Sequence, residues 1–217
     1  MSMSLVSAGP SLIVCPTEMA NDQALPLSLL WTQGVCSSQG LSIGTDDYFE
    51  MAVSEMGRIA WNVTEADKTT YSNSSEKTTN AKAVTDIAGQ YLLPDQIASL
   101  DKAFDSLSQA NPGSKVGNFV TTWWDSLSNQ AQGTVFSAAP VGKTAQGPIG
   151  TTLSYFGFNA SFSSWQSFFT SNTTARTDLV SQHVQLTLNT DLWSRIEGAI
   201  AQKLGKAAIA SIQRLDL

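Results

Sequence analysis

Apolar side chains recur every three or four residues in several long stretches of the chain, a spacing that places them on one face of an α-helix. The clearest stretch begins at Thr45, a favourable N-cap residue, and the acidic residues Asp46, Asp47 and Glu50 follow where the helix dipole stabilises negative charge. The same spacing predicts five amphipathic helices, at about 45–62, 80–92, 94–110, 115–130 and 190–213.

Alternating or continuous apolar runs predict strands between these helices. About four are expected, at Leu12–Cys15, Thr134–Ala138, Thr151–Phe158 and Val180–Leu188. Helices and strands do not alternate strictly, so the pattern indicates an α+β fold in which the helices pack with a small sheet as one domain over residues 1–217.

Two stretches lack a clear period. Residues 1–44 are broken by proline and glycine and predict an irregular segment, apart from the strand at Leu12–Cys15 and a short helix around Leu27–Trp31. Residues 64–79 carry almost no apolar side chains and predict a mobile polar loop.

The composition restricts the possible partners. Charged residues make up 14% of the chain, against about 25% in an average protein. Serine and threonine are correspondingly abundant, with 28 and 21 copies. The net charge of −6, with only 12 Lys+Arg and no cluster of them, excludes nucleic acid and polybasic anchoring to anionic lipid. This acidic, hydroxyl-rich pattern is typical of soluble extracellular proteins, virion surfaces and carbohydrate-handling modules.

The cysteines and histidine give no metal-site pattern. Cys15, Cys36 and His183 are the only cysteines and histidine in the sequence, and their spacing matches no zinc motif. We therefore expect neither a metal nor a cofactor. A disulfide between Cys15 and Cys36 is one possibility, and two buried free thiols are the simpler interpretation. No apolar run is long enough to cross a membrane. Four N-x-S/T sequons, at Asn62, Asn73, Asn159 and Asn172, slightly favour an extracellular location.

Three motifs suggest catalysis and fail on inspection. The segment Ser137–Thr144, SAAPVGKT, lacks the first glycine of a phosphate-binding loop and no helix can follow it. His183 falls on a polar strand face and is interpreted as a surface or hydrogen-bonded histidine, because no nucleophile motif accompanies it. The carboxylates at 46, 47 and 50 are explained by the helix dipole. The sequence therefore names no catalytic residue and favours a non-enzymatic protein.

The most unusual feature is an aromatic cluster in a stretch without charge, residues 151–175. From Phe158 the spacing fits one helix face, and the adjacent pair Trp123-Trp124 is expected to join it, because neighbouring tryptophans on a helix should not both face one core. Filling the core is the simpler interpretation, and an uncharged aromatic binding surface is the functional one. The candidate binding residues are Tyr155, Phe158, Phe162, Trp165, Phe169, Trp123 and Trp124.

Three functions fit these features. The favoured hypothesis is a non-catalytic, toxin-like extracellular protein whose aromatic surface contacts a membrane, a carbohydrate or a protein partner. The second is a small-molecule-binding or hydrolytic domain with an aromatic-lined pocket. The third is a self-assembling structural protein, in which apolar helices form contacts in a homo-oligomer.

Overall fold

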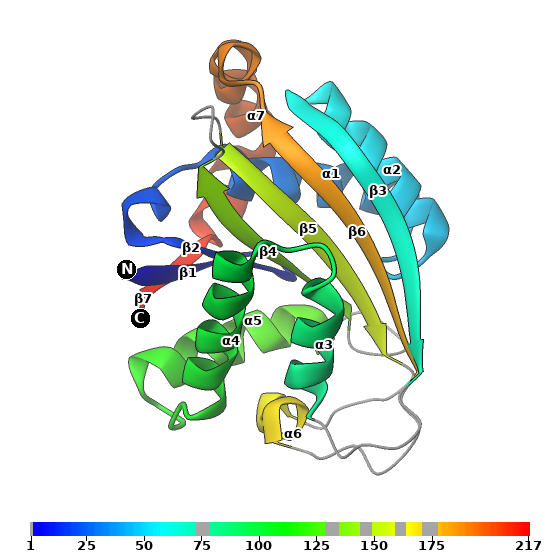
Figure 1. Cartoon of the computed structure of the whole chain (residues 1–217). Helices are drawn as coiled ribbons and strands as arrows, with labels where there is room; N and C mark the ends of the chain where they lie inside the picture. The colour runs from blue at the N-terminus through cyan, green and yellow to red at the C-terminus, as the bar shows by residue number, and fades with distance from the viewer. Residues whose placement is uncertain (1, 73–78, 129–134, 144–148, 159–163, 171–177) are drawn as a thin grey trace.

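The computed structural model describes residues 2–72, 79–128, 135–143, 149–158, 164–170 and 178–217. The strands in these ranges form one seven-stranded sheet in the order β3-β6-β5-β4-β2-β1-β7 (Figure 1). The strands are β1 (Met3–Ala8), β2 (Ser11–Pro16), β3 (Trp61–Ser72), β4 (Val135–Lys143), β5 (Ile149–Phe158), β6 (Asp178–Leu188) and β7 (Gln213–Asp216). Neighbouring strands are antiparallel except for β2 and β4, which run parallel.

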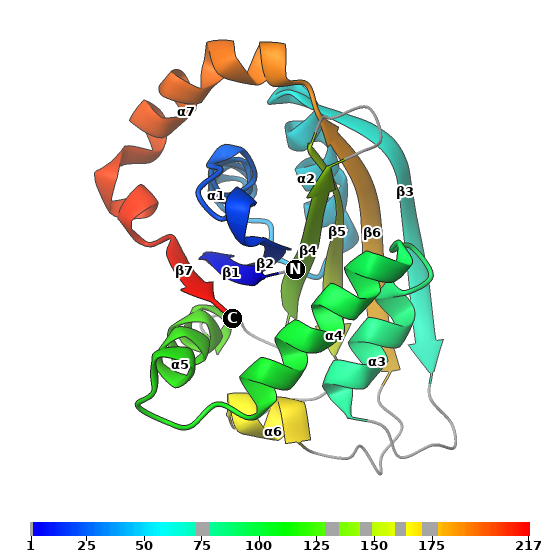
Figure 2. The same cartoon turned by 60° about the vertical axis from the view of Figure 1, so that its left-hand side comes forward.

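Helices cover both faces of this sheet (Figure 2). Successive side chains of β5 point to opposite faces of the sheet, so the core consists of two apolar clusters, one on each face. Phe156 belongs to one cluster and its neighbour Tyr155 to the other. The first cluster is closed by α3 (Asn80–Ala88), α4 (Pro94–Ser108), α5 (Lys115–Ser128) and α6 (Trp165–Thr170). The second is closed by α1 (Ala24–Ser38), α2 (Asp46–Arg58) and α7 (Thr190–Ala210).

The predicted fold class, α+β, is confirmed, and so are the positions of most predicted elements. The start of α2 follows the predicted chemistry, because the hydroxyl of Thr45 accepts a hydrogen bond of 3.2 Å from the backbone N–H of Tyr48. The four other predicted helices correspond to α3, α4, α5 and α7, with ends that differ by a few residues. Within the described ranges, no helix is both long and apolar enough to span a bilayer.

The prediction of an irregular segment over residues 1–44 is wrong. Most of the segment is ordered as β1, β2 and α1, with a short 3-10 turn at Thr17–Met19. The hairpin joins Ala8 to Ser11 across a turn in which Gly9 adopts a positive φ of 56°. The predicted strand at Leu12–Cys15 corresponds to β2, and the predicted helix around Leu27–Trp31 is the middle of α1. β1 was not predicted, because both of its faces are buried and its side chains show no polar alternation.

The predicted mobile loop at residues 64–79 is also wrong for its first nine residues, which belong to β3. β3 pairs with β6 from Trp61↔Leu188 to Ser72↔Asp178, and none of the described strands pairs with its other side, so it is an edge of the described sheet. Side chains from Asn62 to Lys68 are exposed, which explains why this strand has no apolar face. With β1, β3 and β7 added, the described sheet has seven strands rather than about four.

The last helix returns the chain to the start of the sheet. α7 packs over α1 as the outermost layer (Figure 2), and Gly205 interrupts it with φ 78° and ψ 163°. The chain then enters β7, which pairs with β1. As a result the two ends lie side by side: the N–H of Leu217 donates to the carbonyl of Met3 over 2.8 Å.

Candidate functional site

The aromatic residues predicted to form a binding surface lie in the core wherever their side chains are described. Trp123, Trp124, Trp165 and Phe169 belong to the cluster under α3–α6, and Tyr155 belongs to the cluster on the opposite face of the sheet. Each is at most 7% exposed. Phe162 and the side chain of Phe158 lie outside the described residues. The described rings therefore form no external aromatic surface, and they stabilise the fold by burial instead.

The argument that two neighbouring tryptophans cannot face one core is wrong for Trp123 and Trp124. Both rings belong to the same cluster, because α5 is covered from more than one side. The indole N–H of Trp123 donates to the carbonyl of Pro10 in the β1–β2 turn over 3.2 Å. The ring of Trp124 contacts Phe168 of α6, with centroids 5.7 Å apart.

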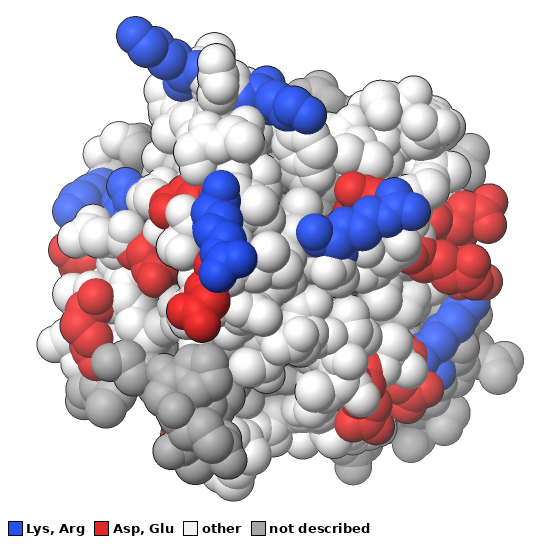
Figure 3. Space-filling view, turned by 90° about the horizontal axis from the view of Figure 1, so that it is seen from above, with Lys and Arg blue, Asp and Glu red and all other residues white. Residues whose placement is uncertain are grey.

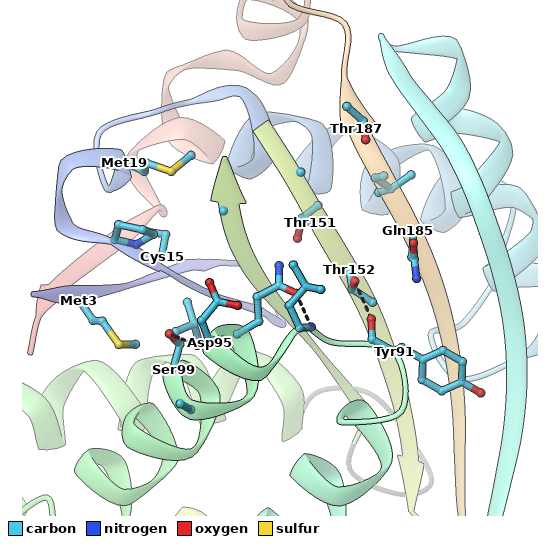
Figure 4. Close-up of a pocket in the computed structure, with 18 of the residues that line it drawn as sticks. Met3, Cys15, Met19, Tyr91, Asp95, Ser99, Thr151, Thr152, Gln185 and Thr187 are labelled. Atoms are coloured by element: carbon cyan, nitrogen blue, oxygen red, sulfur yellow. Dashed lines mark hydrogen bonds between the residues drawn. The ribbon is translucent and has the colours of Figure 1, made fainter. Parts of the chain in front are cut away.

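A cavity of about 920 Å³ opens between α4 and the sheet (Figure 4). It forms where neighbouring strands separate. β2 pairs with β4 only as far as Val14↔Pro140 and then turns into Thr17–Met19, whereas β4, β5 and β6 remain paired beyond this point. The first turns of α4 cross the resulting gap, with the Gln96 side chain accepting a 3.0 Å hydrogen bond from the N–H of Leu93.

The cavity has two chemically different walls. On one side lie apolar and sulfur-bearing side chains of β1, β2 and the following turn: Met3, Val14, Cys15 and Met19. On the other side, β5 and β6 present uncharged hydroxyl and amide groups: Thr151, Thr152, Gln185 and Thr187. The Thr152 hydroxyl donates to the carbonyl of Tyr91 over 3.4 Å, whereas the Gln185 side chain makes no hydrogen bond to the described part of the chain.

Among the described residues that line the cavity, charged groups lie only at its exposed margin. Charged side chains are also sparse on the face of the molecule seen in Figure 3, where they are scattered among uncharged residues. Glu18, Asp95 and Lys102 line it and all three side chains are exposed, which gives the margin one net negative charge. The Cys15 thiol on the apolar wall is buried and donates a weak hydrogen bond to the carbonyl of Ser4. Burial, and secondarily the negative charge of Asp22, raise the pKa of Cys15 to about 11, so this thiol stays protonated near neutral pH.

His183 lies behind one wall of the cavity and not in it. Its imidazole is 1% exposed, which corrects the prediction of an exposed strand face and agrees with the prediction of a hydrogen-bonded histidine. Tyr91, which lines the cavity, stacks on the imidazole with centroids 4.0 Å apart. The Tyr91 hydroxyl donates to Asp67 over 3.0 Å and also contacts the Thr69 hydroxyl. The stack and these polar contacts together hold the ring in place.

Both ring nitrogens of His183 form hydrogen bonds with serine hydroxyls. Ser154 lies 2.8 Å from Nδ1 and Ser181 lies 2.9 Å from Nε2, and both serines are buried. Burial lowers the pKa of His183 to about 4, against a smaller opposing effect of Asp67, so the ring is neutral at physiological pH. A catalytic serine–histidine pair needs a hydroxyl that reaches substrate and a group that stabilises the imidazolium. Both hydroxyls are buried, and the effect of Asp67 on the imidazolium is smaller than that of burial, so the network serves to satisfy buried polar groups.

The other sequence motifs also have structural explanations. Residues Ser137–Lys143 of the phosphate-loop-like segment are part of β4, and Thr144 lies outside the described residues. At the start of α2, the Asp46 carboxylate accepts hydrogen bonds from Lys68 at 2.6 Å and from Gln182 at 2.8 Å. Cys15 and Cys36 are both free and buried, which confirms the simpler interpretation. Among the described residues, no three His, Cys, Asp or Glu side chains come close enough to hold a metal ion.

Sequence reasoning missed the cavity residues because they are dispersed. They come from six strands, from the turn after β2, from the turn between α3 and α4 and from α4 itself, so no short stretch of sequence contains more than a part of one wall. The only local indication is the unusual density of hydroxyl and amide side chains on β5 and β6, for example Thr151 and Thr152, in strands that are otherwise buried.

Comparison with known proteins gives little further information. No protein-family model matches the chain, and no curated protein matches it. Among solved structures, the Evf virulence factor matches with 10% sequence identity over 89% of this chain and 81% of that chain, at a TM-score of 0.37. A TM-score this low does not establish a common fold, and it gives no basis for transferring a function.

Proposed function

We propose that this chain is a ligand-binding protein whose cavity between α4 and the sheet holds a small, uncharged, amphipathic molecule. The observation that carries the proposal is the cavity itself, with a volume of about 920 Å³. Binding sites for small molecules typically measure about 300–1,000 Å³ and combine apolar lining with a few placed polar groups. The two facing walls of this cavity supply both kinds of lining.

The polar wall favours a ligand with hydroxyl or amide groups. Threonine hydroxyls both donate and accept hydrogen bonds, and so does the amide of Gln185. A ligand that enters without such groups would displace water from the Gln185 amide and leave it without a partner, which costs about 1–3 kcal/mol when such a group becomes buried. The Thr152 hydroxyl already donates to the carbonyl of Tyr91, so the requirement is most direct at Gln185 on β6.

The charges at the margin argue against an anionic ligand. Glu18 and Asp95 outnumber Lys102 there, and the whole chain carries a net charge of −6. An anion would approach against this potential, whereas an uncharged molecule is unaffected by it. The lining also favours binding over catalysis, because the Cys15 thiol stays protonated and His183 is not among the residues that line the cavity.

Titration with Nile red, an uncharged fluorophore that brightens in apolar surroundings, tests the proposal. Ala98 lines the cavity from α4 and its side chain is exposed, so Ala98→Trp should fill the cavity without disturbing the core. The matched control is Ala199→Trp, also at an exposed position of a helix but on α7, away from the cavity.

We expect Nile red to bind the parent chain and Ala199→Trp equally and to bind Ala98→Trp at least tenfold more weakly. Urea unfolding of all three proteins verifies that each is folded. Equal affinity in the parent chain and in folded Ala98→Trp would place the dye elsewhere and refute the proposal, as would the absence of any saturable binding.

A further inference from the structure

A second, smaller cavity lies directly behind the apolar wall of the first. It measures about 20 Å³ and is lined by the apolar side chains of Val6, Ile13, Leu25, Pro26 and Ile149, with Asp22 as its one charged neighbour. Cys15 and Met19 line both cavities, so these two side chains are the partition between them. The Asp22 carboxylate accepts a 2.8 Å hydrogen bond from the N–H of Ala24 at the start of α1, and the rest of the lining is uncharged.

The two halves of this partition differ in mobility. Cys15 is a buried residue of β2, and its thiol is held on the carbonyl of Ser4. Met19 follows the strand in the short 3-10 turn, where it is only partly buried. A methionine side chain has three rotatable bonds and no branch, so it changes rotamer at little cost and fills irregular spaces. Rotation of Met19 alone would join the two cavities.

We infer that the ligand is a single-chain amphiphile with an unbranched alkyl chain, and that the end of this chain passes Met19 into the small cavity. This inference rests on the proposed function and specifies its ligand. The uncharged, hydroxyl-bearing head contacts the wall formed by Thr151, Thr152, Gln185 and Thr187, and the chain lies along Met3 and Val14. A space of about 20 Å³ accepts the narrow end of an alkyl chain and excludes a ring or a branched group.

Displacement of Nile red by n-alkyl β-glucosides, from hexyl to decyl and below their critical micelle concentrations, measures the effect of chain length. Each methylene that moves from water into an apolar site contributes about 0.8 kcal/mol, which corresponds to about fourfold in affinity. We expect this gain for each added carbon until the chain end reaches the back of the small cavity, and no gain for longer chains.

Val6→Ile places one extra methylene in the small cavity and leaves the large cavity unchanged. The expected result is that affinity stops rising one carbon earlier than in the parent chain, so that the best glucoside binds about fourfold more weakly. Val53→Ile is the matched control, because Val53 lies on α2 and lines neither cavity. Met19→Ala removes the movable partition and should extend the rise to a longer chain.

The outcomes separate this inference from the proposed function. If Nile red binds in the cavity but the glucosides show no dependence on chain length, or show the same dependence in Val6→Ile as in the parent chain, the alkyl-chain inference is wrong and the binding function stands. If neither the dye nor any glucoside binds to the parent chain, the proposed function itself fails.

Discussion

The phenol ring of Tyr91 lies on the imidazole of His183, with centroids 4.0 Å apart and the ring planes inclined by 19°. Tyr91 belongs to the turn between α3 and α4, whereas His183 lies in β6, so this stack fastens the helical layer to the sheet. The backbone carbonyl of the same residue accepts the hydrogen bond from Thr152 at the cavity wall. Tyr91 therefore takes part both in the burial of His183 and in the lining of the cavity.

Burial of His183 predicts a loss of stability in mild acid. The imidazole has a pKa of about 4 in the folded protein, compared with 6.5 when it is accessible to water. Between these values the unfolded chain binds a proton that the folded chain does not, so stability is complete above pH 6.5 and falls as the pH decreases towards 4. The expected contribution over this range is about 3 kcal/mol.

Urea unfolding of the parent chain and of His183→Gln at pH 7 and at pH 4 isolates this contribution from that of the carboxylates, which both proteins share. The difference in unfolding free energy between the two proteins should shrink by about 3 kcal/mol from pH 7 to pH 4. A difference that stays constant with pH would mean that His183 keeps an ordinary pKa in the fold.

Two substitutions of Tyr91 separate its hydroxyl from its ring. Tyr91→Phe removes the hydrogen bonds to Asp67 and Thr69 but keeps the stack, and we expect it to cost about 1 kcal/mol. Tyr91→Ala uncovers the imidazole, so the pKa of His183 should rise towards 6.5. Because His183 is the single histidine, its proton NMR signals can be titrated without assignment. An unchanged pKa in Tyr91→Ala would show that other groups bury the ring.

The two thiols should react slowly in the folded protein. Burial raises the pKa of both Cys15 and Cys36 from 9.0 to about 11, which lowers the thiolate fraction about 100-fold. Alkylation by iodoacetamide at pH 7 should therefore be at least about 100-fold slower than in urea. In a Cys36→Ala variant, saturating octyl glucoside should slow alkylation of Cys15 further, since this thiol lines the cavity. Rapid alkylation without urea would contradict the described burial.

Burial of the tryptophan pair predicts a large effect where the sequence alone suggested a surface. Trp123→Ala should cost about 3–5 kcal/mol of unfolding free energy, because it leaves a void in the core and removes the hydrogen bond to Pro10. Leu93→Ser, at the 63% exposed N-cap position of α4, should not lower stability, because serine is a better N-cap than leucine. Similar, small effects of the two substitutions in urea unfolding would restore the surface interpretation of Trp123.

Sequence analysis works best for helices that bury one face and expose the other, because their apolar residues then recur at a clear period. In α2, the cap at Thr45 and the apolar stripe agree, and the structure confirms both. β3 escaped prediction because its residues from Asn62 to Lys68 face water, and only pairing with β6 makes them a strand. β1 escaped for the opposite reason, and α1 was predicted only around Leu27–Trp31, since burial on several sides weakens the period that sequence analysis depends on.

The functional prediction depended on the aromatic residues, and the structure assigns those that it describes to the core. A sequence shows that Trp165 and Phe169 share a helix face but does not show what covers that face; here the cover is the cluster that includes α3, α4 and α5. The cavity depends on where β2 leaves β4, a relationship between residues more than 120 apart such as Val14 and Pro140. Extracellular location and self-association stay predictions from composition.

The neighbouring ends of the chain have a consequence for how it folds. Ser4 and Asp216 share a 2.6 Å hydrogen bond across a separation of 212 residues, so pairing of β1 with β7 closes nearly the whole polypeptide into one ring. Contacts of such long range slow folding. A circular permutant that fuses the ends through a short glycine linker and reopens the chain in the exposed turn at residues 109–113 would make this pairing local, and would be expected to refold faster than the parent.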